Sequence, residues 1–134
     1  MIKKRILVVD DESALTRMVR LNLEKTDRFE VRVENNAVNA LSAAKEFEPD
    51  LILLDVMMPS MDGGDVKAQI RRNRKLKKTP IIFLTASVSS GESGSSGFNS
   101  GGELFLSKPI SAERLIQVID QHMPSEDPEI PPLV

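Results

Sequence analysis

The 134-residue chain has no cysteine, no excess of positive charge and no long apolar run. Without cysteine the chain can form neither disulfides nor thiolate metal sites. The lack of cysteine is consistent with a reducing compartment. The formal net charge of −2 excludes the global basic field that drives nonspecific nucleic-acid binding. Its longest strongly apolar runs have four residues, Ile6 to Val9 and Leu51 to Leu54, whereas a membrane-spanning helix needs about 20.

A secretory signal is also unsupported. The basic start Lys3-Lys4-Arg5 resembles the first part of a signal peptide, but Asp10 and Asp11 interrupt the following apolar stretch before it reaches the usual ~7 to 15 residues. We therefore expect a cytoplasmic protein without membrane contact. A single domain of this length hides roughly two-thirds of the surface that its unfolded chain exposes, so a core forms without cross-links.

Short apolar runs alternate with segments of helical periodicity. Between the runs, apolar residues recur every three or four positions, as at Leu15, Met18, Val19 and Leu23. Ser13, Asn36 and Ser111 stand where N-cap side chains are expected. The repeated strand–helix units predict an α/β fold, a doubly wound five-stranded parallel sheet covered on both faces. The five expected strands are 6–9, 31–33, 51–54, 81–84 and 104–106.

Two segments break this pattern. Twelve of the sixteen residues from 87 to 102 are Ser or Gly, where a fourth helix is expected. Each Gly inside a helix costs about 1 kcal/mol relative to Ala, so we expect this segment to be mobile or an irregular, shortened helix around Phe98. Residues 124–134 contain four prolines, which predicts an extended tail or linker stub after a domain spanning 1–123.

Polar residues follow four of the expected strands. They are Asp10 and Asp11, Asp55, Thr85, and Lys108. Each alone has an ordinary explanation as a helix cap, a strand former or a solvated charge. Ligands bind beyond the carboxyl ends of the strands in open parallel sheets, and all five residues lie there. Their joint placement therefore indicates a functional site.

The residue types narrow the chemistry of this site. Carboxylates of Asp10, Asp11 and Asp55 held together repel one another, and a divalent cation relieves the repulsion. Oxygen ligands without His or Cys favour Mg²⁺ completed by water. A cation beside Lys108 makes a pocket for a phosphoryl group, with Thr85 as a hydroxyl donor. Asp55 is then the expected nucleophile, forming an acyl phosphate.

These motifs together resemble the receiver domains of response regulators in two-component signalling. The resemblance covers about residues 3 to 123 and is carried by Leu7-Val-Val-Asp-Asp-Glu12, Leu53-Leu-Asp-Val-Met-Met-Pro59, Met61-Asp-Gly63, Thr85-Ala86 and Lys108-Pro109. It implies the strand order 2-1-3-4-5, which is that family's order. It further implies that Asp55 accepts phosphate from a sensor histidine kinase or a phosphotransfer protein.

The resemblance also implies individual roles. Asp10, Asp11, Asp55 and the Met57 backbone carbonyl would bind Mg²⁺, while Thr85 and Lys108 would each contact a phosphoryl oxygen. Phe105 would be the aromatic switch that moves inward as Thr85 is drawn to the phosphate. The Lys108–Pro109 bond is often cis in this family, and Gly63 would provide a turn with positive φ. The output would pass to another protein or to an effector domain outside this sequence.

Three other classes of protein fit these residues less well than a phosphoacceptor receiver. A Mg²⁺-dependent phosphohydrolase would want a second aspartate two residues after Asp55, where Met57 stands. A flavodoxin-like cofactor binder would suffer phosphate repulsion from the acidic residues 10–12. A degenerate, binding-only receiver is disfavoured by the complete acceptor set. We expect no enzyme with a substrate of its own: the protein would catalyse only its own phosphorylation and dephosphorylation.

The remaining charged features are interpreted as ordinary surface. The segment 71–78 carries six basic residues but no aromatic for base stacking, so we expect a solvated basic face rather than direct nucleic-acid binding; the alternative is a docking patch for an acidic partner. His122 is expected to be an exposed residue at a helix end.

Overall fold

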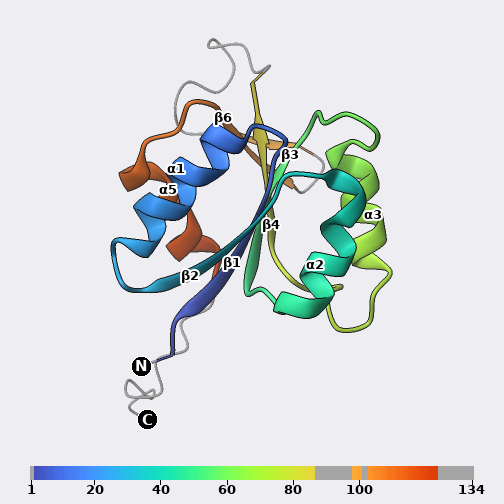
Figure 1. Ribbon diagram of the computed structural model, residues 1–134, viewed down its shortest axis with the longest axis horizontal. Helices are drawn as coiled ribbons and strands as arrows, with labels where there is room; N and C mark the ends of the chain where they lie inside the picture. The colour runs from blue at the N-terminus through green and yellow to red at the C-terminus, as the bar shows by residue number, and fades with distance from the viewer. Residues whose placement is uncertain (1, 87–97, 101–102, 124–134) are drawn as a thin grey trace.

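Five parallel strands form the centre of the molecule (Figure 1). The computed structural model describes residues 2–86, 98–100 and 103–123. The parallel strands lie in the order β2-β1-β3-β4-β6, which is the predicted order 2-1-3-4-5. Their bounds are β1 Lys4–Val9, β2 Phe29–Glu34, β3 Leu51–Asp55, β4 Ile81–Thr85 and β6 Glu103–Ser107.

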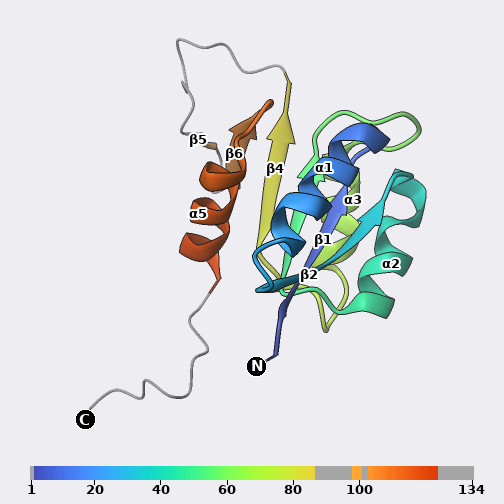
Figure 2. The same cartoon turned by 60° about the vertical axis from the view of Figure 1, so that its left-hand side comes forward.

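Helices cover both faces of this sheet, which Figure 1 shows nearly edge-on with helices to its left and right; Figure 2 shows the same elements after a turn about the vertical axis. Alternate residues of each strand face opposite sides, so Ile6 and Val8 pack in one core and Leu7 and Val9 in the other. The first core is closed by α1 Ser13–Glu24 and α5 Ala112–His122, and the second by α2 Ala40–Phe47, which follows a short 3-10 turn at Ala37–Asn39, and α3 Gly63–Arg71. The predicted doubly wound α/β architecture is confirmed.

Two of the three predicted caps are confirmed. The Asn36 side chain accepts a hydrogen bond from Val38 N, and the Ser111 side chain accepts one from Arg114 N. The prediction for Ser13 was wrong, because α1 already begins at Ser13 and Glu12 occupies the cap position. Glu12 makes no side-chain cap bond; its own backbone N–H donates to Asp10 Oδ1 at 3.0 Å.

The expected positive φ at Gly63 was also wrong. The left-handed residue of this turn is Ser60, with φ of 74°, whereas Gly63 is the first residue of α3. Glycine is required at position 63 by close approach: a Cβ there would lie 2.5 Å from the Asp55 backbone oxygen. The helix therefore starts directly against the end of β3, and this contact fixes α3 beside Asp55.

The Ser/Gly-rich segment lies largely outside the described residues. Its described part, Phe98–Ser100, forms β5, which pairs antiparallel with β6 at the edge of the sheet. A helix around Phe98 was therefore the wrong expectation, because these residues pair with the open edge of β6 instead. Residues 87–97 and the tail 124–134 lie outside the described residues.

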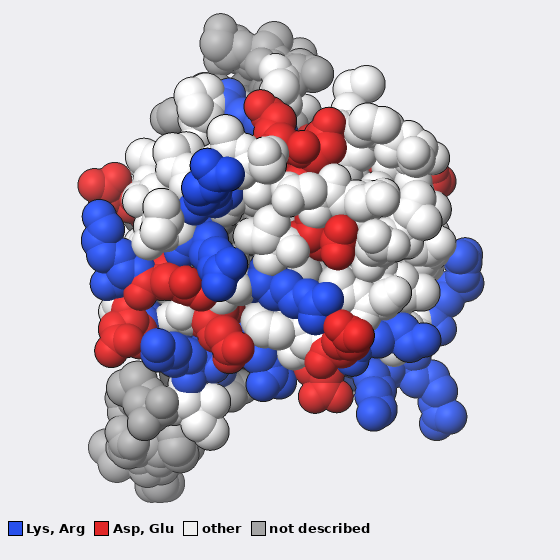
Figure 3. Space-filling view, in the orientation of Figure 1, with Lys and Arg blue, Asp and Glu red and all other residues white. Residues whose placement is uncertain are grey.

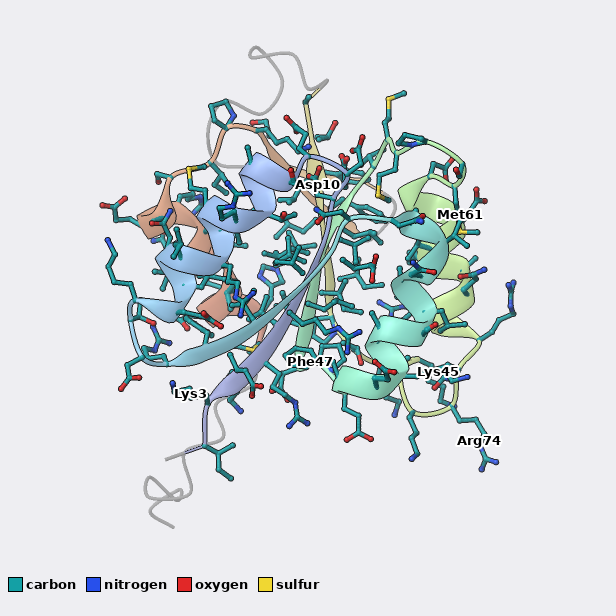
Figure 4. All side chains as sticks on the ribbon, in the orientation of Figure 1. Lys3, Asp10, Lys45, Phe47, Met61 and Arg74 are labelled. Carbon is teal, nitrogen blue, oxygen red and sulfur yellow. The ribbon has the colours of Figure 1, made fainter. Side chains whose placement is uncertain are left out.

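The basic segment 71–78 follows α3 at the end of the sheet opposite the strand ends that carry the polar residues. The Arg71 guanidinium donates to the Thr79 carbonyl at 2.8 Å, and Leu76 is buried beneath the loop. The other basic residues of this segment are exposed, and Figure 4 shows Arg74 extending away from the protein. In Figure 3, basic side chains along the lower edge are interspersed with acidic ones. None of the helices in the described part of the chain has the length and apolarity needed to cross a membrane.

Candidate functional site

The predicted site residues meet at the carboxyl ends of four adjacent strands. Asp10 directly follows β1, Asp55 ends β3, Thr85 ends β4, and Lys108 directly follows β6. Figure 4 places Asp10 at this end of the sheet, between the two helical layers. Because the strands are parallel and adjacent, side chains separated by up to 98 positions in sequence converge on one edge.

The acidic cluster consists of Asp10, Asp11 and Asp55. Each offers a carboxylate oxygen, and these oxygens all lie within 4.8 Å of one another. Asp10 and Asp55 are buried, whereas Asp11 is exposed. The buried Asp10 Oδ2 is paired with the Lys108 ammonium, 2.8 Å away. Three crowded carboxylates, one of them exposed to solvent, match the oxygen ligands that a hard divalent cation prefers.

Lys108 neutralises part of this negative charge. Its ammonium Nζ lies 2.8 Å from Asp10 Oδ2, 3.1 Å from Glu12 Oε1 and 3.3 Å from Asp55 Oδ1. Burial alone lowers the pKa of Lys108, but its contacts with Asp10 and Glu12 and the charges of Asp10 and Asp55 outweigh burial and raise the pKa above its ordinary value. The side chain is therefore a fixed positive charge at any physiological pH.

Asp55 is electrostatically the most perturbed carboxylate in the described site. The pKa of Asp55 is raised to about 6: burial is the largest cause, the negative charge of Asp10 adds to it, and Lys108 opposes both effects. The ionised form of Asp55 is thus poorly stabilised by the protein alone. Added positive charge near its carboxylate would favour ionisation, which a nucleophilic role requires.

A pocket of about 260 Å³ opens next to Asp55. Thr85 and Ala86 line one part of it, and Met57 lies at its exposed rim with 71% of its surface accessible. This volume accommodates a tetrahedral phosphoryl group with water. The remaining lining residues are Asp11, Glu12, Asp55 and Lys108.

The aromatic residue assigned to the switch, Phe105, lies on β6, three residues before Lys108. The Phe105 ring stacks on Phe83 with 5.0 Å between the ring centroids and 17° between the planes. Phe105 is half-buried against the core on the α2–α3 side of the sheet. The Lys108–Pro109 peptide bond is cis, as the resemblance implied.

Sequence reasoning missed two residues that contact this constellation. Glu12 was noted as part of a motif without a role, yet it pairs with Lys108 and lines the pocket. Asn35 was not predicted to contribute to the site, although its side-chain amide donates to the Asp10 backbone oxygen. The position of Glu12 directly after Asp10-Asp11 was a usable signal, whereas Asn35 had none, because its partner lies on another strand.

Comparisons with known proteins agree with this geometry. Residues 6–120 match the family model described as the response regulator receiver domain. The chain is 40% identical over 114 residues to the transcriptional regulatory protein ResD of Bacillus subtilis, covering 84% of this chain and 45% of that protein. It is 33% identical over 112 residues to the transcriptional regulator RpaA of Synechocystis sp., covering 84% and 46%.

Solved structures show the same likeness. The chemotaxis protein CheY4 of Vibrio cholerae has a TM-score of 0.76 with 28% identity, over 90% of this chain and 98% of that one. A response regulator from Chloroflexus aurantiacus has a TM-score of 0.75 with 27% identity, over 90% and 97%. The chain spans about half the length of the curated relatives that it matches. With the family model covering most of its length, the chain belongs to the response regulator receiver domain family of two-component signalling.

Proposed function

We propose that Asp55 is the phosphoacceptor of this receiver domain and takes a phosphoryl group from the phosphohistidine of a sensor kinase or a phosphotransfer protein. The observation that carries the proposal is the convergence of three carboxylates and one ammonium, with Lys108 Nζ 3.3 Å from Asp55 Oδ1 and an open pocket beside them. The phosphoacceptor role follows from the family, and this arrangement supplies the residue that fits it.

The acidic cluster fits Mg²⁺. Asp10, Asp11 and Asp55 would hold the ion, and we assign the Met57 backbone carbonyl as a further ligand. Bound there, Mg²⁺ would supply positive charge that offsets the charge on the transferring phosphoryl oxygens. The crowding of the three carboxylates and the raised pKa of Asp55 both support a cation at this position.

The chain's own residues account for the transfer. An Asp55 carboxylate oxygen forms a new bond to phosphorus while the bond from phosphorus to the imidazole nitrogen breaks, and that nitrogen keeps the electron pair and takes up a proton. In this proposal Lys108 contacts one phosphoryl oxygen through its ammonium, and Thr85 contacts another through its hydroxyl. Hydrolysis returns Asp55 to its free form. In this proposal, these self-directed reactions are the protein's only catalysis.

Phosphorylation shifts the population of molecules between two conformations whose surfaces differ. Phosphate favours the conformation in which Thr85 and Lys108 contact it better, and Phe105 repacks as Thr85 moves. We propose that residues 1–123 form the receiver, that 124–134 is a linker, and that a downstream protein or an effector domain reads the change in the cytoplasm. ResD and RpaA are described as transcriptional regulators, and about half of each lies outside the matched region.

The test is to incubate the protein with a small-molecule phosphodonor, with and without Mg²⁺, and to weigh the intact chain. We expect the addition of one phosphoryl group that needs Mg²⁺, survives acid and is lost in base. Asp55→Asn should abolish it, while the exposed Asp65→Asn should leave it unchanged. Continuous release of phosphate without a phosphorylated protein would instead indicate a hydrolase. Unchanged mass of the wild-type chain would refute the proposal.

A further inference from the structure

Asn35 lies at the point where β1 and β2 separate. The two strands pair in parallel up to Val9 and Glu34, and the Asp10 backbone N–H still donates to the Glu34 carbonyl at 3.1 Å. The next donor of a continued ladder would be the Asn36 N–H, but this group donates to the Glu34 side chain at 3.0 Å. The Asp10 carbonyl therefore loses its expected strand partner.

The Asn35 side chain replaces the missing partner. Its Nδ2 amide donates to the Asp10 backbone oxygen at 2.8 Å and to Thr16 Oγ1 at 3.0 Å. Thr16 is buried in the first turn of α1, and its hydroxyl donates to the Ser13 carbonyl at 3.1 Å. One amide group thus connects the end of β1, the start of α1 and the loop after β2.

This contact acts on the acidic cluster through the backbone. The Asp10 carbonyl belongs to the planar peptide unit that joins Asp10 to Asp11, so fixing its oxygen fixes the plane from which Asp11 extends. Asp10 is already held by its burial and by the Glu12 N–H, which donates to Asp10 Oδ1. Asp11 is the exposed member of the cluster, and its carboxyl group lies close to those of Asp10 and Asp55.

We propose that Asn35 is a positioning residue for the divalent cation, because it holds the peptide between Asp10 and Asp11 in the orientation that lets both carboxylates face the same ion. The inference rests on the proposed Mg²⁺ site. It concerns a residue that does not itself contact the ion: Asn35 acts through Asp10 and Asp11. Partners that orient metal ligands in this indirect way commonly change metal affinity about 10- to 100-fold when they are removed.

The chain offers a matched control for the test. Asn35→Asp keeps the side-chain shape but presents oxygens to the Asp10 carbonyl, and Asn36→Asp makes the same chemical change one residue away. The Asn36 side chain caps Val38 N, a task that aspartate performs equally well. Both variants add one negative charge to the loop after β2, and Asn35→Ala, which adds none, separates the effect of charge from the loss of the amide.

The measurement is the Mg²⁺ dissociation constant by titration calorimetry, with urea unfolding of the metal-free proteins alongside. We expect Asn35→Asp to weaken Mg²⁺ binding about 10-fold and Asn36→Asp to stay within about twofold of the wild type. Asn35→Ala, which adds no charge, should also weaken binding. Thr16→Val should lower stability but keep most of the affinity, because it leaves the bond from Asn35 to Asp10 in place.

Three outcomes separate the possibilities. Equal Mg²⁺ affinity in Asn35→Asp and Asn36→Asp would overturn the positioning role. Loss of stability in the Asn35 variants without any loss of affinity would also overturn it and leave Asn35 a structural residue. No saturable Mg²⁺ binding by the wild type would refute the proposed cation site itself, and with it the basis of the inference.

Discussion

Replacing Asp55 with asparagine should stabilise the metal-free protein at neutral pH, although it removes the proposed acceptor. Burial and the charge of Asp10 raise the pKa of Asp55 from 3.8 to about 6. Between these two pH values the folded protein binds more protons than the unfolded chain, so stability falls as the pH rises through this window. One pKa unit corresponds to 1.36 kcal/mol, so ionised Asp55 costs the folded state about 3 kcal/mol above pH 7.

Asparagine is nearly isosteric with aspartate and carries no charge at any pH. Its carbonyl oxygen can still accept a hydrogen bond from Lys108. The gain in the free energy of unfolding should therefore be about 3 kcal/mol near pH 7.5 and only about 1 kcal/mol near pH 4.5, where the wild-type carboxyl is mostly protonated in the folded state. Added Mg²⁺ should reduce the difference in the free energy of unfolding between Asp55→Asn and the wild type at the higher pH, because Mg²⁺ binds and stabilises the folded wild type.

The assay is urea unfolding of the wild type and Asp55→Asn with a chelator, repeated with excess Mg²⁺. Asp65→Asn, an exposed carboxylate on α3, is the control and should show no comparable gain. An Asp55→Asn protein no more stable than the wild type at neutral pH would refute the electrostatic reasoning. A gain of equal size at both pH values would also refute it, because packing and not titration would then be the cause.

Three further changes test the packing and charge of the site. Lys108→Met should destabilise the protein by about 3 kcal/mol at neutral pH, because it leaves buried carboxylates, Asp55 among them, without their cation; urea unfolding measures this. Gly63→Ala should cost about 1 to 3 kcal/mol through the clash with the end of β3, whereas Gly64→Ala should cost less, because its Cβ would meet the Asp62 side-chain oxygen at 3.3 Å rather than backbone. Phe105→Ala should cost about 2 kcal/mol by removing a half-buried ring from its stack, as thermal or urea unfolding can show.

Each of these three predictions would be contradicted by a specific result. A Lys108→Met protein as stable as the wild type would mean that its ion pairs contribute nothing net. Equal effects at positions 63 and 64 would show that the close approach at Gly63 does not limit the fold. Unchanged stability of Phe105→Ala would mean that its stacking on Phe83 is not maintained in solution.

Much of this molecule could be predicted because its signals are local. The unbroken apolar runs at 51–54 and 81–84 identify buried parallel strands, since a strand covered on both faces has no polar side. Polar residues at the ends of these strands indicate where ligands bind, because parallel strands all end at the same edge. That is why Asp10, Asp55, Thr85 and Lys108 could be placed together from the sequence, and the family resemblance then gave the order of the strands.

The features that the sequence did not predict depend on contacts between segments that are distant in the chain. Gly63 is required by its closeness to the Asp55 backbone, and Phe98–Ser100 forms a strand because it lies against the open edge of β6. The same is true of the raised pKa of Asp55 and of two contacts that were not predicted, Glu12 with Lys108 and Asn35 with the Asp10 carbonyl. These features arise only because strands far apart in sequence lie side by side. Sequence alone determined which residues occupy this edge, because strand periodicity is a local property. Only the tertiary structure decided which of them touch, because charge, burial and close approach depend on distances across the sheet.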